Sequence, residues 1–508
     1  MTKRALLSVY DKTGLIEFAR GLASLGFELI SSGGTSKALA EAGLAHCTVE
    51  SVTGSPEMLD GRVKTLHPAI HGGMLADRTK PEHLADLERH GIGLIDLVVS
   101  NLYPFTSQPS IEMIDIGGPT SVRAAAKNHA HVAIVVDPSE YRSVLDELRA
   151  GGGVLCDATR RRLARDAFAH TAAYDAAIAT WFDETDTADG KTATPKSIHL
   201  ALEHAQSLRY GENPHQVGAR YRFAGTVSWW DNAIQHGGKE LSYLNVYDTD
   251  AAWRLVHELG DGPAVAIVKH ANPCGVAVAS DITTAYQLAH LCDPVSAYGG
   301  IVAVNRRVPI ELAEALAHVF TEVVVAPSYN PEALKVLLAR KNLRVMSATG
   351  PSLERFEYRS VDGGLLVQQP DRIGDDVARQ ESWKVVTKAQ PTADQWRDLV
   401  LAWRVCAHVK SNAIVIAAGG QAIGIGAGQQ SRVDSAEIAA RKAGDRARGA
   451  ACASDAFFPF RDGLDTVAAA GVAAVIQPGG SVRDDEVIAA ADGHGMAMVM
   501  TGTRHFRH

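Results

Sequence analysis

A lysine and a histidine stand side by side where a run of small apolar residues ends, in the sequence AVAIVKHANPCGVA at residues 264–277. The apolar run has the composition of a buried strand, which Lys269 and His270 interrupt. Neighbours on a strand point to opposite faces, so both side chains can enter one pocket only where the strand ends and the chain turns. We predict that turn at residues 272–275, NPCG.

Three interpretations compete for this stretch. A zinc site needs three or four ligands, but His270 and Cys274 supply only two, and no C-x-x-C or H-x-E motif accompanies them. The metal interpretation is therefore disfavoured, and a buried core histidine remains open. In the third interpretation the Lys269 ammonium keeps the imidazole neutral, so that His270 is a base beside a charge stabiliser. That arrangement suits acyl or formyl transfer.

A second group of polar residues lies near the N-terminus and has the composition of an anion site. The sequence ELISSGGTSKALA (28–40) reads as strand, glycine turn and helix, so its N–H and hydroxyl groups can converge on an anion. A plain turn with a Ser or Thr N-cap explains it equally well when it is taken alone. Two further segments add charge: 8–13 at another strand-to-helix junction, and GRVKTLHPAIHGG (61–73), which shows little helical periodicity. The polar residues concerned are Ser8, Asp11, Lys12, Thr13, Ser32, Gly33, Gly34, Thr35, Arg62, Lys64 and Thr65.

Four more side chains are predicted at the same place. Asn101 and Tyr103 follow the apolar segment 94–100, and Asp115 precedes a helical segment that carries Lys127. Strand-to-helix junctions of a doubly wound sheet meet outside the carboxyl ends of the strands. We therefore predict a pocket for a phosphorylated ligand, with Lys, Tyr and Asp as proton carriers, although Asp115 and Lys127 could also form a simple salt bridge.

Composition limits the class of protein. The chain has 508 residues, 46% of them hydrophobic, and a formal net charge of −8, which argues against nucleic acid or an anionic membrane as the main partner. Six scattered cysteines without C-x-x-C do not suggest a disulfide framework. No signal peptide or membrane span is visible, so we predict a cytoplasmic protein.

The order of segments predicts an α/β protein. Strands at 5–9, 27–30, 94–100 and 131–136 alternate with helices at 13–25 and 35–42, which favours a parallel sheet covered on both faces. Helices at 139–149 and 161–181 and a polar linker (DETDTADGKTATPKS) follow. We predict a first domain over 1–195 and a second over 196–508, the latter with lobes at about 196–365 and 366–508. Strands of the second lobe are expected at 413–416, 422–426 and 472–476.

The second domain contains further polar junctions. RYGENPHQ (209–216) reads as a loop, and Asn245 and Asp248 are expected just before a helix, where N-capping would explain them. Tyr298 and Gly299 are expected on a turn, Glu322 just before a strand, and Asn412 at a strand edge. The segment IGIGAGQQSR (423–432) lacks the dinucleotide-binding spacing, so we predict a glycine-lined strand that a ligand approaches closely.

Taken together, these motifs resemble one family. SVYDKTG, SSGGT, GRVKTLHP, SNLYPF, DIGGPTSVRAAAKNH, RYGENPHQ, VKHANPCG, SAYGG, KSNAI, GIGAGQQSR, SDAFFPFRDG and QPGGSVRDDE are similar, in order and over nearly the whole chain, to the AICAR transformylase/IMP cyclohydrolase family. The resemblance implies an N-terminal methylglyoxal-synthase-like parallel α/β domain and two tandem cytidine-deaminase-like α/β subdomains without catalytic zinc. It also implies a homodimer with the transformylase site at the subunit interface.

For the N-terminal domain the resemblance implies closure of the purine ring, in which formyl-AICAR loses water and becomes IMP. The nucleotide would be bound by residues of the 8–13, 32–35 and 62–65 motifs and by Asn101. Lys64 would stabilise the developing oxyanion, and Tyr103, Asp115 and Lys127 would relay protons, Lys127 matching the family's proposed proton donor and acceptor.

For the C-terminal domain the resemblance implies formyl transfer from 10-formyltetrahydrofolate, the co-substrate, to the 5-amino group of AICAR. His270 matches the general base and Lys269 the transition-state stabiliser. AICAR would contact Arg209, Tyr210, Asn245, Tyr298, Gly299, Glu322, Asn412 and Arg432. Folate would contact Val433, Phe457, Asp462, Ser481, Val482 and Arg504.

Two positions depart from the family pattern and two other functions compete with it. Tyr298 stands where some members have Phe, and Glu322 where some have Asp, so the carboxylate at 322 is one methylene further from the backbone. A nucleotide-binding regulatory protein would not need Lys64, Lys127, Lys269 and His270, and a zinc nucleoside deaminase would need ligand spacings that the sequence lacks.

Overall fold

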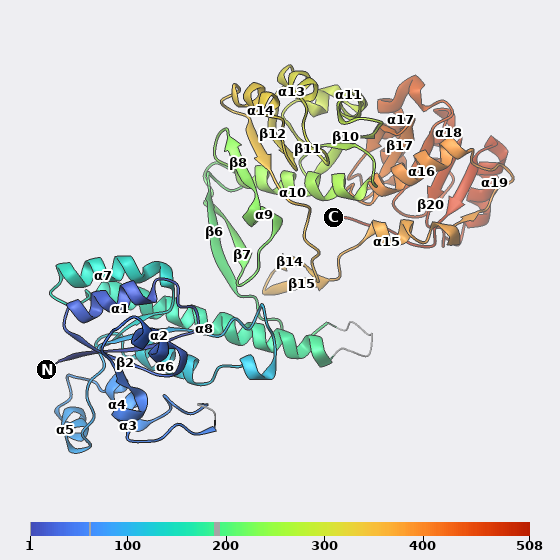
Figure 1. Ribbon diagram of the computed structural model, residues 1–508. Coiled ribbons are helices and arrows are strands. Elements are labelled where there is room, and N and C mark those ends of the chain that lie inside the picture. The colour runs from blue at the N-terminus through green and yellow to red at the C-terminus, as the bar shows by residue number, and fades with distance from the viewer. Residues whose placement is uncertain (1, 60–61, 187–193) are drawn as a thin grey trace. The chain divides into compact units, whose positions relative to one another are not determined.

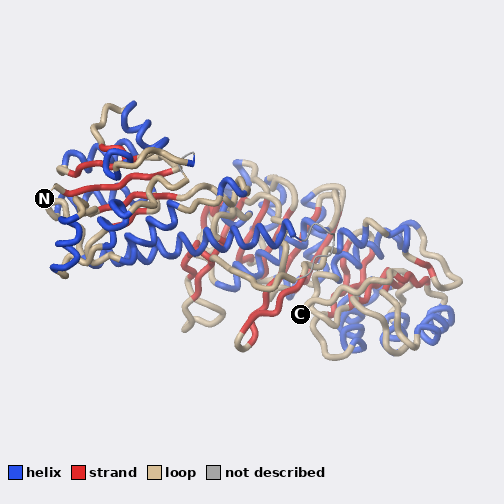
Figure 2. Tube along the Cα trace, turned by 90° about the horizontal axis from the view of Figure 1, so that it is seen from below, coloured by secondary structure: helices blue, strands red, loops and turns tan. Residues whose placement is uncertain are grey.

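The computed structural model describes residues 2–59, 62–186 and 194–508, and the chain forms two compact units. Unit 1 comprises Met1–Glu203 with Phe223–Thr226, and unit 2 comprises His204–Arg222 with Val227–His508. The predicted polar linker lies partly outside the described residues; its first four residues belong to a helix. Figure 1 labels many of the elements of each unit, and Figure 2 shows helices lying on both sides of the strands.

Unit 1 is built on a five-stranded parallel sheet with the order β3-β2-β1-β4-β5. The strands are β1 (Lys3–Val9), β2 (Phe27–Ser31), β3 (Cys47–Thr48), β4 (Leu97–Asn101) and β5 (Ala133–Val135). The helices are α1 (Leu15–Ser24), α2 (Gly33–Glu41), α3 (Val49–Thr53), α4 (Pro68–Leu75), α5 (Pro81–Arg89), α6 (Gly117–Lys127), α7 (Tyr141–Ala150) and α8 (Asp157–Asp186), with short 3-10 turns η2 (Ile111–Met113) and η3 (Pro138–Glu140).

Alternation of side chains along β1 separates two cores in unit 1. Leu7 belongs to the core that α1 and α7 cover, where Phe18 stacks on Tyr141, whereas Leu6 belongs to the core that α4, α6 and α8 cover. A parallel sheet with helices on both faces is thus confirmed.

Unit 2 contains a twelve-stranded mixed sheet with the order β16-β21-β20-β19-β17-β18-β10-β9-β11-β12-β13-β8. Its strands are β8 (Ile234–Gly237), β9 (Ala264–Lys269), β10 (Asn272–Val278), β11 (Gly300–Val304), β12 (Thr321–Ala326), β13 (Arg344–Ser347), β16 (Lys384–Val385), β17 (Ile414–Ala418), β18 (Gln421–Gly426), β19 (Ala451–Ser454), β20 (Ala474–Gln477) and β21 (Ala497–Met500). Outward from β10 the strands are β9, β11, β12, β13 and β8, and outward from β18 they are β17, β19, β20, β21 and β16. The two series have the same relative order along the chain, so the sheet consists of two similar halves.

The helices of unit 2 repeat in the same way. One face carries α10 (Tyr243–Glu258) and α16 (Ala393–Cys406), whose buried Trp253 and Trp403 occupy equivalent positions in a shared core. The other face carries α11 (Ile282–Cys292), α13 (Ile310–Ala317) and α14 (Pro331–Leu338) over one half, and α17 (Arg432–Ala443), α18 (Asp462–Ala469) and α19 (Asp484–His494) over the other. The cytidine-deaminase likeness of these halves stays a prediction.

Smaller elements complete the described chain. Two-stranded sheets are formed by β6 (Leu202–Leu208) with β7 (Gly218–Phe223), and by β14 (Glu357–Val361) with β15 (Gly364–Gln368). Short helical segments are α9 (Trp229–Asn232), α12 (Pro294–Ala297), α15 (Ile373–Val377), η4 (Gln380–Ser382) and η5 (Gly444–Ala447). Within the described ranges no helix is both long and apolar enough to cross a membrane.

Two local predictions were wrong, and one segment with little helical periodicity is helical. The segment 68–75 forms α4, which begins with Pro68 and is capped by His67 Nδ1 accepting the Ala69 N–H at 3.1 Å. Asn245 and Asp248 lie within α10 rather than before it, because Ser242 is the N-cap and Asn245 closes a capping box three residues later. Glu322 lies within β12 rather than before it.

The C-terminal segment is fixed by a buried histidine between two carboxylates. His505 Nδ1 lies 2.7 Å from Asp371 and Nε2 3.2 Å from Asp376, which also accepts the Trp403 indole N–H at 2.9 Å. Burial alone would lower the pKa of His505, but the hydrogen bonds to the two carboxylates outweigh it and raise the pKa to about 9. The imidazolium therefore stabilises the folded state.

This cluster predicts a loss of stability at alkaline pH. Because the pKa is raised on folding, the contribution is complete below pH 6.5 and disappears as the pH rises through about 9. It amounts to about 3 kcal/mol at most. The difference in melting temperature between the wild type and His505→Asn should therefore be larger at pH 6 than at pH 10. A difference that does not depend on pH would contradict the charged state of His505.

Candidate active sites

In unit 1 the carboxyl ends of β1, β2 and β4 lie side by side. Parallel pairing sets Leu7 beside Ser31 and Val9 beside Asn101, so the loops that follow these strands meet at one edge. This edge gathers most of the polar residues that the sequence predicts for the N-terminal site.

Two lysines lie at the N-terminus of α2. A Cβ atom on Gly33 would stand 3.4 Å from Lys64 Nζ, and one on Gly34 would stand 3.6 Å from Lys12 Nζ. Lys64 Nζ also pairs with Glu57 at 2.7 Å. Two ammonium groups beside the N–H groups of a helix N-terminus have the charge and donors that an anion such as a phosphate requires.

Asn101 holds the neighbouring loop in place. Its Oδ1 accepts the N–H groups of Tyr10 and Asp11 at 2.7 and 2.9 Å, and its Nδ2 donates to the Asp11 carbonyl at 2.9 Å. The Asp11 carboxylate accepts the hydroxyl and N–H of Thr13, which lowers the pKa of Asp11. These side chains therefore shape the loop around Lys12, and Ser8, in the preceding strand β1, is half-buried.

Thr35 and Ser32 start α2 differently from a standard capped helix. Thr35 is buried, and its hydroxyl accepts the Val9 N–H and donates to the Val9 carbonyl, both at 3.0 Å. Ser32 is the N-cap residue but makes no side-chain capping hydrogen bond. Thr35 thus ties α2 to β1, and the Ser32 hydroxyl makes no capping contact with the helix.

Asp115 is held at the start of α6. Its Oδ1 accepts the Gly118 N–H at 2.9 Å, its own N–H donates to the Tyr174 hydroxyl at 2.8 Å, and burial raises its pKa. A Cβ on Gly118 would stand 2.2 Å from Asp115 Oδ2, so any larger residue there would displace the Asp115 carboxylate. Thr65 Oγ1 lies 3.0 Å from the equivalent point on Gly117, which brings the 62–65 motif to the same place.

The remaining predicted residues of this site differ in placement. The Tyr103 ring is 41% exposed and lies edge-on to Tyr10, with centroids 5.5 Å apart. Arg62 forms an exposed pair with Glu112 at 2.6 Å. Lys127 is the last residue of α6, about 15 Å along the helix from Gly117, so the structure does not bring it to Asp115. Its place in a proton relay stays a prediction.

Unit 2 gathers its predicted residues at one edge of the large sheet. Because β10 is antiparallel to both β9 and β18, the His270 turn lies at the edge where β18 ends. The amino ends of β11, β12 and β13 reach this edge. The carboxyl ends of β19, β20 and β21 reach it from the other half of the sheet.

The structure corrects the position of the turn beside His270. The turn is the residue pair His270 and Ala271, both with φ of 54°, whereas residues 272–275 open β10. Asp248 on α10 accepts both N–H groups, that of His270 at 2.9 Å and that of Ala271 at 2.8 Å. His270 is exposed, which excludes the buried core histidine.

Lys269 and Cys274 flank this turn. Lys269 Nζ donates to the Tyr298 carbonyl at 2.9 Å, which links it to the loop containing Gly299. Gly299 has φ of 80°, and the Tyr298 ring is 61% exposed. Cys274 is buried, and its thiol bonds to the Ile267 carbonyl, so it is part of the core.

A polar group surrounds the N-terminus of α10. Asn245 Nδ2 donates to Glu322 at 2.7 Å, and Glu322 also pairs with Arg344 at 3.4 Å. Burial lowers the pKa of Arg344, and the charge of Arg209 adds to this effect. The Arg209 guanidinium lies 4.6 Å from the Tyr210 ring centroid. Our sequence predictions missed Arg344, although an arginine in an otherwise apolar strand was a visible signal.

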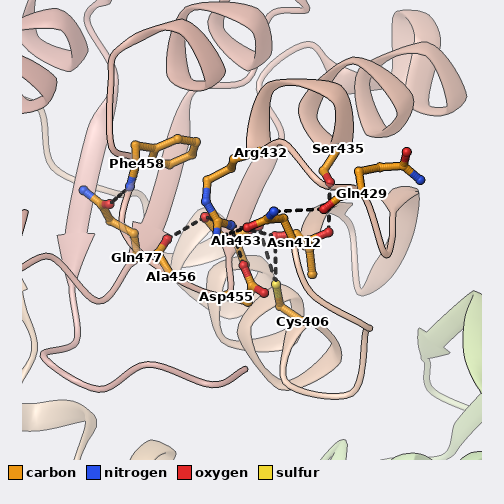
Figure 3. Close-up of polar contacts among 12 residues, drawn as sticks. Cys406, Asn412, Gln429, Arg432, Ser435, Ala453, Asp455, Ala456, Phe458 and Gln477 are labelled. Carbon is orange, nitrogen blue, oxygen red and sulfur yellow. Dashed lines mark hydrogen bonds and ion pairs between the residues drawn. The ribbon is translucent and has the colours of Figure 1, made fainter. Parts of the chain in front are cut away.

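Asn412 and Arg432 belong to one hydrogen-bonded network (Figure 3). Buried Arg432 pairs with Asp455, donates to Ser454 Oγ at 2.8 Å and donates to Asn412 Oδ1 at 2.8 Å. Asn412 Nδ2 in turn donates to the carbonyls of Gln429 and Gln430. Arg432 thus braces Asn412. A pocket of about 360 Å³ adjoins this network. It is lined by Ser411, Asn412, Gly428, Gln429, Gln430, Phe506 and His508.

The glycines of β18 face a helix and not an open pocket, which corrects our prediction. A Cβ on Gly424 would stand 2.2 Å from the Ala439 carbonyl oxygen, and one on Gly426 2.0 Å from that of Ser435. Both carbonyls belong to α17. These glycines therefore allow α17 to pack closely against the strand.

The predicted folate residues lie where unit 2 strands end. Phe457 and Asp462 follow β19, Ser481 and Val482 follow β20, and Arg504 follows β21. Val433 is the second residue of α17. Val482 is fully exposed, and Arg504 stacks over Phe506 at 4.3 Å.

Two further observations concern sites outside these groups. Within the ranges that the structure describes, no three His, Cys, Asp or Glu side chains are grouped so that they could hold a metal ion. A cavity of about 900 Å³ in unit 1, beside α8 and residues 198–203, is lined by none of the predicted site residues.

Comparison with known proteins supplies the identity. Residues 125–442 match the family model of the AICARFT/IMPCHase bienzyme, and residues 14–129 match the MGS-like domain. A solved structure described as the crystal structure of ForH is 36% identical over 36% of this chain and 100% of that chain, with a TM-score of 0.34, which is too low for a structural argument. The family match covers more than half of the chain. The chain therefore belongs to the AICARFT/IMPCHase bienzyme family and is a bifunctional enzyme of purine biosynthesis, an AICAR formyltransferase that uses 10-formyltetrahydrofolate and an IMP cyclohydrolase.

Proposed function

We propose that formyl transfer takes place at the edge of the unit 2 sheet, with His270 and Lys269 as its catalytic residues. The observation that carries the proposal is that Lys269, the last residue of β9, and His270, in the turn that follows, lie at the edge where the nucleotide and folate candidates gather. His270 accepts a proton from the 5-amino nitrogen of AICAR as that nitrogen attacks the formyl carbon. Lys269 stabilises the oxyanion, and the folate N10 leaves with a proton.

The polar residues around this turn would bind the two substrates. Arg209, Tyr210, Asn245 and Glu322 surround the start of α10 and are proposed to hold AICAR together with Tyr298 and Gly299. Asn412 contributes through the brace that Arg432 provides. The ends of β19, β20 and β21, with Val433, are proposed to bind folate through Phe457, Asp462, Ser481, Val482 and Arg504.

Ring closure is proposed at the edge of the unit 1 sheet. Lys12 and the start of α2 would bind the nucleotide phosphate with Ser8, Ser32, Gly33, Gly34 and Arg62. The ammonium of Lys64 would stabilise the oxyanion that forms when the carboxamide nitrogen attacks the formyl carbon. Asp115, whose pKa is raised by burial, and Tyr103 would carry the protons that leave with water.

We also propose that the enzyme works as a cytoplasmic homodimer with the transformylase site at the subunit interface. The exposure of His270, Tyr298 and Val482 in a single chain is consistent with a second subunit that covers them. Six free thiols fit a reducing compartment.

Replacing His270 separates the two activities. His270→Ala should lower kcat of formyl transfer about 100-fold or more, since a positioned base typically contributes that much. Cyclisation of supplied formyl-AICAR should stay within twofold of the wild type. His290→Ala, on α11, is the control and should change neither activity. Loss of cyclisation in His270→Ala, or transfer at the wild-type rate, would overturn this division.

The lysines of unit 1 can be ranked by the same cyclisation assay. Lys64→Ala should lower cyclisation about 100-fold by removing the oxyanion stabiliser. Lys127→Ala tests the predicted relay: a loss close to that of Lys64→Ala is expected if Lys127 carries a proton. Undiminished cyclisation in Lys127→Ala would remove Lys127 from the relay, in keeping with its position at the far end of α6. Formyl transfer, measured by tetrahydrofolate release, should be unchanged in both.

A further inference from the structure

The two halves of the unit 2 sheet contain the same hydrogen-bonded arrangement, in which a helix carboxylate accepts the two N–H groups of a hairpin turn. In one half Asp248, the sixth residue of α10, accepts the N–H groups of His270 and Ala271 at 2.9 and 2.8 Å. In the other half Asp398, the sixth residue of α16, accepts the N–H groups of Gly419 and Gly420 at 2.9 and 2.8 Å. In both halves the pair forms the turn of an antiparallel hairpin, β9–β10 or β17–β18.

The two turns differ in the residues that occupy the left-handed region. Gly419 and Gly420 have φ of 61° and 77°, which glycine adopts at no steric cost. His270 and Ala271 both have φ of 54°, which is uncommon for residues with a Cβ and costs of order 1 kcal/mol or more each. The half that carries the chemistry thus keeps side chains in a turn whose counterpart uses glycine.

We infer that Asp248 is a positioning residue for formyl transfer: its carboxylate holds the His270 turn so that the imidazole points toward the reacting amine. The inference rests on the proposed role of His270. Two hydrogen bonds from one carboxylate fix both peptide planes of the turn, and these planes determine the direction in which the His270 side chain leaves the backbone. A shift of about 1 Å in such a group can cost a factor of 100 in rate.

The same helix connects the base to the nucleotide candidates. Asn245, three residues before Asp248 and therefore on the same face of α10, donates to Glu322. Asp248 is buried, and burial raises its pKa while the two N–H donors oppose the rise. The buried face of α10 thus contacts both the turn that carries the base and a group that would bind AICAR.

The equivalent arrangement in the other half, Asp398 with the Gly419–Gly420 turn, supplies a matched control. Strand pairing places the Gly419 turn next to Val278, the last residue of β10, and thus at the opposite edge of the sheet from His270. Removing the Asp398 carboxylate should therefore destabilise an equivalent hairpin without touching the transfer site.

The test compares Asp248→Asn with Asp398→Asn in the full-length enzyme. An amide keeps one acceptor oxygen, so each variant loses one strong hydrogen bond, and the two should lower the melting temperature by similar amounts. Asp248→Asn should lower kcat of formyl transfer about 10- to 100-fold with the KM for AICAR within twofold. Asp398→Asn should leave kcat within twofold, and both variants should cyclise formyl-AICAR normally.

Each other outcome is decisive. Equal kcat values for the two variants would show that Asp248 acts only on stability and would overturn the inference. If Asp248→Asn does not fold, Asp248→Glu keeps the charge but shifts the carboxylate by one methylene, and kcat at the wild-type level in that variant would likewise overturn it. If His270→Ala transfers formyl normally, the proposed function fails. If only His270→Ala is inactive, the inference alone fails.

Discussion

The pairing of β10 with β18 is the constraint on which the arrangement of unit 2 depends. The two strands run antiparallel, so one half of the sheet presents the amino ends of β11, β12 and β13 at the edge where the other half presents the carboxyl ends of β19, β20 and β21. One edge thereby receives a basic turn and polar residues from the first half, and folate candidates from the second. Parallel pairing of these two strands would instead place the folate candidates at the opposite edge from the proposed base.

In unit 1 the candidate site depends on a simpler rule, the parallel direction of the strands. In a parallel sheet every carboxyl end lies at the same edge, and the helices that follow begin there with free N–H groups. Lys12 and Lys64 add positive charge at the start of α2, and Asn101 and Thr35 hold the loops between strands by hydrogen bonds to the backbone. The same rule explains the position of Lys127, because α6 begins at the site edge and ends at the opposite one.

The sequence predicted the parallel sheet of unit 1 well because apolar strands alternate there with amphipathic helices, as at β1 and α1. It predicted the glycine alternation of β18 as a strand, but not that α17 lies against Gly424 and Gly426, since a close backbone approach looks the same whether a helix or a ligand causes it. The exact position of the turn at His270 and Ala271 could not be predicted from the sequence either. Positive φ at a histidine and an alanine has no local signature, and the carboxylate that supports it lies 22 residues away. The cluster of Arg344, Glu322 and Asn245 depends on the pairing of β12 with β13 and on the packing of α10 against the sheet. Hydrophobic periodicity along the sequence reveals neither.

The claim that His270 faces the amine of AICAR can be measured directly. A crystal structure of the enzyme with AICAR and a non-transferring folate analogue would give the distance from the His270 imidazole to the 5-amino nitrogen. The account predicts about 3 Å, within hydrogen-bond reach, with Lys269 on the side of the formyl oxygen. A nucleotide bound at the same edge but with its amine beyond reach of His270, even through one water, would contradict it.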